Sequence, residues 1–152
     1  MADYYAFLNL KPFNCFHCQQ YIKESEEFRK IKDYFINSEH KTIIVENIPM
    51  PANITPIEWN DKTTMDVDEK TSHLLLKQSL DTYYEWEHDT CKIYKEASEE
   101  LFEKGYFDAY CFVRELIDDV EKEKKHIKNI KSDLSAVDYD YNKIKDFWYK
   151  LM

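Results

Sequence analysis

Glycine is almost missing from this chain, which holds a single one, Gly105, among 152 residues. A β-rich protein of this length would need several glycines for its hairpin turns and bulges, so their scarcity favours helices. Proline is confined to positions 12, 49, 51 and 56, and the rest of the chain holds no helix breaker except Gly105. Long helices are therefore expected after residue 56.

Three further absences narrow the class of protein. No apolar run approaches the roughly 20 residues of a membrane-spanning helix. The N-terminus, MADYYAFLNLK, lacks the basic region and apolar core of a secretory signal, so a cytoplasmic protein is expected, with reduced thiols at Cys15, Cys18, Cys91 and Cys111. Basic residues number 21 against 30 acidic ones, a net charge of −9. That charge disfavours nucleic acids and anionic membranes as partners and suits the attraction of cations.

The residues that are present can form one helical domain over residues 1–152. The chain is 43% hydrophobic and 16% aromatic, which is enough apolar surface for a core. Helical periodicity and breakers predict a stub at 1–12 ended by Pro12, helices at 13–37, 66–104 and 107–134, and a short helix at 139–152. Residues 38–65 lack helical period, contain three prolines and are expected to form a long crossover. We expect Asp66 or Asp68 to cap the second long helix and Asp108 to cap the third, after a tight turn at Gly105.

Each long helix carries a carboxylate on its apolar stripe. Glu87 interrupts a stripe that otherwise reads Leu76, Leu80, Tyr83, Thr90, Tyr94, Ala97 and Leu101. Glu123 lies between Val120 and Ile127, and Glu27 lies beside Phe28. An isolated buried carboxylate is costly, and a shared cation would offset that cost; oxygen ligands in the middle of a helical bundle point to iron. On spacing alone, the alternative that these residues border solvated faces stays open.

The connections predict how the helices are arranged. Helices joined by a tight turn are antiparallel neighbours, and a long crossover lets the helix before it lie parallel to the helix after it. The expected fold is therefore all-α: a ferritin-like antiparallel bundle with one long crossover and a short C-terminal helix. Only the stub at residues 1–12 stands where a first long helix would lie, so we expect that helix to be truncated.

From about Tyr21 to Met152, the order of the segments resembles the ferritin family. IKESEEFRKIKDYF resembles the second ferritin helix with its Glu-Glu-x-x-His signature, and TIIVENIPMPANITPIEW resembles the crossover strand. YEWEHDTCKIYKEASEELFEKGYFDAYCFVRELIDDVEKEKKHIKNI resembles the third and fourth helices with their turn, and YDYNKIKDFWYKLM resembles the short fifth helix. The resemblance implies that Glu27 is the carboxylate bridging two irons, Glu87 is the third-helix ligand, and Glu123 is the fourth-helix position near the second iron.

Three departures from the ferritin pattern imply an incomplete di-iron site. Lys30 stands where the family has its histidine, and an ammonium repels a cation. Val120 aligns with the fourth-helix glutamine, and the first-helix glutamate has no counterpart. Ferroxidase activity, the oxidation of Fe(II) by O2, is therefore expected to be impaired. The apolar surface left by a missing first helix would need to be covered by a neighbouring chain.

The resemblance implies cytoplasmic iron storage: a multi-subunit shell of like chains, or of mixed ferritin chains, that sequesters iron as ferric mineral. The alternative function is a non-catalytic structural subunit or helical interaction module that co-assembles with complete ferritin chains.

Other candidate sites are weaker. Cys15 and Cys18 form a C-x-x-C pair that is better interpreted as packing than as a metal or redox site. Among the histidines, His126 follows Glu123 by three residues and is near enough to approach a metal there.

Overall fold

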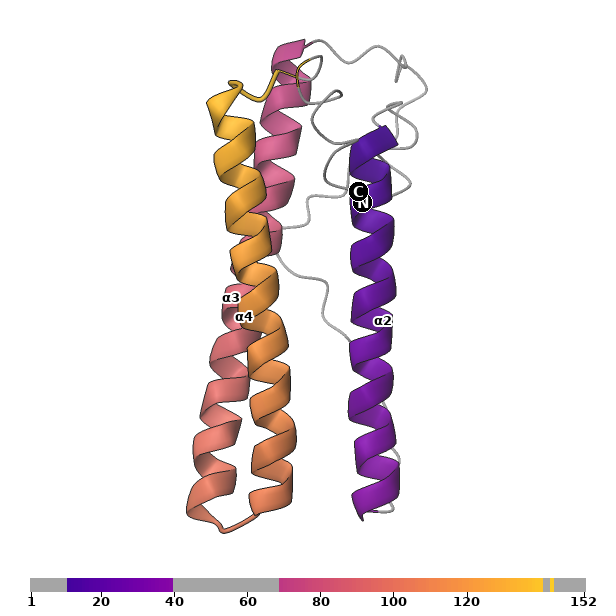
Figure 1. Ribbon diagram of the computed structural model, residues 1–152, viewed down its shortest axis with the longest axis vertical. Coiled ribbons are helices and arrows are strands. Elements are labelled where there is room, and N and C mark those ends of the chain that lie inside the picture. Colours follow the sequence, from indigo (N-terminus) through magenta and orange to yellow (C-terminus); the bar gives the residue numbers. More distant parts are fainter. Residues whose placement is uncertain (1–10, 40–68, 141–142, 144–152) are drawn as a thin grey trace. The chain divides into compact units, whose positions relative to one another are not determined.

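The computed structural model describes residues 11–39, 69–140 and 143. These residues form three helices, α2 (Lys11–Glu39), α3 (Glu69–Glu103) and α4 (Phe107–Ala136) (Figure 1). No strand occurs among them, which confirms the all-α class. No helix in this part of the chain has a stretch long and apolar enough to cross a membrane. Most of the predicted stub at 1–12, crossover at 38–65 and short helix at 139–152 lies outside the described residues.

The chain divides into two compact units, Met1–Val67 and Asp68–Met152, and each is described by itself. Helix α2 belongs to the first unit and extends two residues beyond the predicted 13–37 at both ends. Pro12, which the sequence predicts to end the stub at 1–12, lies in the first turn of α2. Proline is tolerated there because the first backbone N–H groups of a helix have no partner within the helix. The side chains that α2 buries are Phe13, Phe16, His17 and Gln20.

Helices α3 and α4 form an antiparallel hairpin in the second unit (Figure 1). Their turn is closed by two hydrogen bonds: the N–H of Gly105 donates to the carbonyl of Phe102, and the N–H of Tyr106 donates to that of Leu101. This pair of bonds is the Schellman motif, which needs a residue with positive φ directly after the helix. Gly105 supplies it, with φ of 75°. The predicted tight stop is confirmed.

The prediction that Asp108 caps α4 is wrong. The N-cap is Tyr106, which makes no side-chain capping bond, and Asp108 lies in the first turn. Its carboxylate there still faces the positive end of the helix dipole, so its contribution is electrostatic. The connection is short because Tyr106 has two roles: its N–H completes the Schellman motif after α3, and it is also the N-cap of α4. The two aspartates predicted to cap α3 lie outside the described residues.

The apolar stripes of α3 and α4 pack against each other along the hairpin. Buried side chains on α3 are Leu76, Ser79, Leu80, Tyr83, Glu87, Cys91 and Ser98, and those on α4 are Leu116, Ile117, Val120, Ile127, Ile130 and Leu134. Towards the turn, Thr90, Tyr94, Ala97 and Leu101 are only partly buried. The predicted stripes are confirmed, and burial is deepest in the half of the hairpin away from the turn.

Replacement of Gly105 tests whether the turn depends on its positive φ. A Cβ at Gly105 would meet no heavy atom within 4 Å, so the cost of a side chain there is conformational. We expect Gly105→Ala to lower the free energy of unfolding by about 1–2 kcal/mol. Gly105→Asn is the matched control and should cost less, since asparagine visits this conformation more readily. Equal losses in the two variants, measured by urea denaturation, would contradict this explanation.

Candidate functional site

The three predicted carboxylates differ in burial. Glu87 on α3 is buried, with 6% of its surface exposed. Glu123 on α4 is half-buried, and its Oε2 atom is inaccessible to solvent. Glu27 on α2 is also half-buried, but it belongs to the other unit, and its participation in a shared site stays a prediction. The interpretation of Glu87 as an edge of a solvated face is therefore wrong: the sequence folds it into the core stripe of the hairpin.

Cross-helix contacts fix the register of α3 against α4. The Cys91 thiol donates a hydrogen bond to Glu121, and Lys131 forms an ion pair with Asp81. These two contacts lie ten residues apart on each helix, so the register stays constant between them. It places Glu87 level with residue 125. Glu123 is two residues from that level, about 3 Å along the helix axis. The hairpin thus brings the two predicted ligands to one level of its interior.

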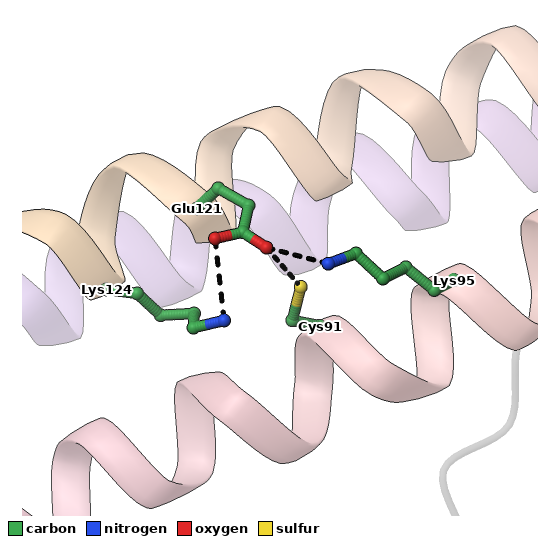
Figure 2. A network of polar contacts seen from close by, with 4 residues as sticks. All are labelled: Cys91, Lys95, Glu121 and Lys124. Carbon is green, nitrogen blue, oxygen red and sulfur yellow. Dashed lines mark hydrogen bonds and ion pairs between the residues drawn. The ribbon is translucent and has the colours of Figure 1, made fainter.

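A polar network lies next to this level and was not predicted from the sequence (Figure 2). Oε1 of Glu121 accepts hydrogen bonds from Lys95 Nζ at 2.8 Å and from the Cys91 thiol at 3.2 Å. Its Oε2 forms an ion pair with Lys124 Nζ at 3.5 Å. The thiol and Lys95 come from α3, while Glu121 and Lys124 come from α4, so the carboxylate links the two helices.

The network favours the charged forms of Glu121 and Lys95. The hydrogen bond from Lys95, followed by that from Cys91, lowers the pKa of Glu121 to about 2. The same bond to Glu121 raises the pKa of Lys95. Both groups are close to half exposed, so water screens their attraction and limits what the pair adds to stability. Cys91 itself is buried against Ile117 and Val120, as a small apolar side chain would be.

Lys124 carries a positive charge into the interior of the hairpin. Only 14% of its side chain is exposed, and it lies one residue from the level of Glu87. Its ammonium pairs with Glu121, so a positive charge already lies near the level at which the sequence predicts a metal ion. Within residues 11–39, 69–140 and 143, no three His, Cys, Asp or Glu side chains are grouped so that they could hold a metal ion. The hairpin therefore offers two carboxylates at one level, beside a competing cation.

The structure also places the residues that depart from the ferritin pattern. Lys30 is exposed on α2, and Val120 is 2% exposed in the core of the hairpin. Val120 packs with Cys91 and Ile117. The position that aligns with the fourth-helix glutamine of ferritins therefore has an apolar side chain and apolar neighbours. His126 is exposed, which does not favour its approach to a metal beside Glu123.

The interpretation of Cys15 and Cys18 as packing residues is wrong, because both thiols are exposed. Helix α2 turns Phe13, Phe16 and His17 inward, and the two cysteines fall on its other side. All four cysteines of the chain are free thiols. Burial, with a smaller effect of the N-terminal charge, lowers the pKa of His17 to about 4, so this imidazole is neutral at pH 7.

The Cys91–Glu121 contact could have been found by counting from the turn. A tight turn at Gly105 fixes which residues of two antiparallel helices face each other, and Cys91 follows directly after a stripe position. Its partner Glu121 is not on the apolar stripe of α4, which passes through Val120 and Glu123 on either side of it. Nothing in the composition distinguishes Glu121 from the other acidic residues of α4, so only the register identifies it.

Comparisons with known proteins add no family to this description. No family model, no curated protein and no solved structure matches the chain. The resemblance to ferritins therefore rests on the quoted segments, and iron storage is taken up below as a proposal.

The pH dependence of stability tests the Glu121 network. A lowered pKa in the folded state stabilises the fold above the ordinary carboxyl pKa of about 4.3. We expect this contribution, about 1 kcal/mol or less because the group is half exposed, to disappear as the pH falls from there to about 2. Urea unfolding of Glu121→Gln should differ from the wild type at pH 5.5 and differ less at pH 3. Glu99→Gln, at an exposed site on α3, is the control. A difference that does not change with pH would contradict the network.

Proposed function

We propose that this chain is a ferritin-like iron-storage subunit of the cytoplasm. It assembles into a multi-subunit shell, with copies of itself or with complete ferritin chains. Iron is its cargo: carboxylates bind it as it enters, and it is held as ferric mineral. The chain itself contributes little ferroxidase activity. The support for this proposal is the hairpin geometry together with the resemblance of the quoted segments to ferritin.

The observation that carries the proposal is the burial of Glu87 at the level of Glu123. A buried carboxylate costs several kcal/mol of free energy unless a positive charge lies close to it. Two carboxylates from facing helices concentrate negative charge in one place and provide hard oxygen ligands of the kind iron prefers. Both residues also take part in other interactions within the protein, so iron must compete for them.

The same geometry predicts weak binding and slow oxidation. Lys124, at 14% exposure beside this level, repels an incoming cation. Val120 offers no polar atom to orient a water molecule or dioxygen. A paired ferrous site needs several ligands converging on both ions, and the hairpin supplies two carboxylates. The chemistry that these residues can perform is therefore capture of iron rather than rapid oxidation of iron pairs by O2.

A second candidate function is a non-catalytic structural subunit or helical interaction module within a mixed shell. The observation that favours it is the largely covered ammonium of Lys124, which pairs with Glu121 next to the level of Glu87 and disfavours a metal ion there. In that case the Glu121 network holds α3 and α4 together, and other chains oxidise and store the iron. The two functions make opposite predictions for binding of ferrous iron to the purified chain.

Anaerobic titration calorimetry with Fe2+ separates them. We expect the wild type to bind iron and Glu87→Gln/Glu123→Gln to bind it roughly tenfold or more weakly, because glutamine keeps the shape and removes the charge. Glu99→Gln/Glu103→Gln, which removes two exposed acids from α3, should bind as the wild type does. After admission of air, oxidation should be close to the rate in buffer. Equal affinities in all three proteins would leave only the structural subunit.

Lys30→His tests the part of the site that the resemblance assigns to α2. If Glu27 and residue 30 face bound iron, a neutral imidazole should strengthen Fe2+ binding because it replaces a repelling ammonium with a ligand. Lys32→His is the matched control, since Lys32 is exposed on the same helix two residues away. The same gain in both variants would contradict a specific role for position 30.

A further inference from the structure

Two exposed thiols lie about one helical turn apart near the start of α2. They belong to Cys15 and Cys18, and both are free. Three residues rotate a helix by about 300°, so the two side chains leave the same side of α2, about 60° apart. Phe16 and His17 between them are buried, and their rings meet edge to face with centroids 5.1 Å apart. These buried rings fix the inner side of the turn and keep both thiols on its outer side.

The spacing of the two thiols does not suit a disulfide bond between them. Side chains three residues apart on a helix have Cβ atoms about 5–6 Å apart. A disulfide requires a separation of about 3.5–4.5 Å, so the bond would distort the helix beside its buried rings. A metal ion between the sulfurs avoids this distortion. Two metal–sulfur bonds of roughly 2.3 Å in a line hold the sulfurs about 4.6 Å apart.

The surroundings of the pair select a soft ion with few ligands. Residues 11–23 contain no aspartate or glutamate, so no carboxylate from this part of α2 is at hand for a hard ion. Thiolates prefer Cu(I) or Zn2+, and a structural zinc needs four ligands. Residues 11–39 contain no other cysteine and no methionine, and the part of the chain that the structure describes holds no group of three metal-binding side chains. Cu(I), in contrast, is complete with two thiolates in a line.

We propose that Cys15 and Cys18 bind one Cu(I) ion as a pair of thiolates. Each thiol releases its proton to water as its sulfur binds, so two protons leave and the complex carries one negative charge. Residues 11–23 contain two lysines and no acid, which favours a complex of this sign. The site is independent of the iron chemistry proposed above, because it uses no carboxylate and none of its residues belongs to the hairpin.

Competition for Cu(I) with a coloured chelator tests the site in the full-length chain, reduced and without oxygen. The wild type should remove one Cu(I) ion per chain from the chelator. Cys15→Ser and Cys18→Ser should each bind it about tenfold or more weakly, because one of two ligands is lost. Cys111→Ser, which removes an exposed thiol from α4, should bind as the wild type does. X-ray absorption at the copper edge should show two sulfur neighbours.

Moving one thiol along the helix tests whether the spacing matters. Cys18→Ser/Ser25→Cys keeps the number of exposed thiols, because Ser25 is also exposed. Its two thiols would lie about 15 Å apart along the axis, too far to share an ion. This variant should therefore bind Cu(I) as weakly as Cys18→Ser does. Circular dichroism verifies that all variants keep their helices.

The outcomes separate a built site from adventitious binding to any thiol. Wild-type affinity in Cys18→Ser/Ser25→Cys would show adventitious binding and overturn the inference, as would fewer than one Cu(I) ion per wild-type chain. Binding of Fe2+ should be the same in the wild type and in Cys15→Ser/Cys18→Ser. A chain that binds Cu(I) at these thiols and binds no Fe2+ would support the site and refute the proposed function.

Discussion

The constraint on which the hairpin depends is the fixed register between α3 and α4. It is set at one end by the Schellman motif at Gly105 and along the interface by the contacts of Cys91 with Glu121 and of Asp81 with Lys131. A change of register would move Glu87 relative to Glu123 along the hairpin. Burial of the apolar stripes resists such a shift, because it would expose core side chains on both helices. The position of every candidate ligand in this unit follows from that register.

Buried acids need positive charge close to them, and this protein has two possible sources. One is the lysines of the α3–α4 network, which already hold Glu121 ionised. The other is a metal ion between Glu87 and Glu123, as the resemblance to ferritin implies. Lys124 pairs with Glu121 and lies one residue from the level of Glu87, so its charge opposes a metal ion there. The proposed iron storage and the structural alternative differ chiefly in the outcome of this competition.

Local rules predicted most of the described fold. The single glycine identified the turn, and helical periodicity placed α3, α4 and their apolar stripes, because these features depend on nearby residues alone. The burial of Glu87 stayed open on spacing alone. Asp108 was misassigned as a cap because the Schellman motif leaves no separate loop for it. The exposure of Cys15 and Cys18 depends on which side of α2 its unit buries, and the Glu121 network depends on pairing between helices. Single-helix patterns contain neither kind of information.

The central claim is that Glu87 and Glu123 bind iron inside the hairpin. The most direct measurement is anomalous X-ray scattering at the iron edge from crystals of the full chain, grown without oxygen and soaked in Fe2+. The account predicts an iron peak about 2.0–2.2 Å from a carboxylate oxygen of each residue, a distance typical of oxygen ligands to divalent metals, with Lys124 displaced from this level. A map with no iron there, and with the ammonium of Lys124 between the two carboxylates, would contradict it.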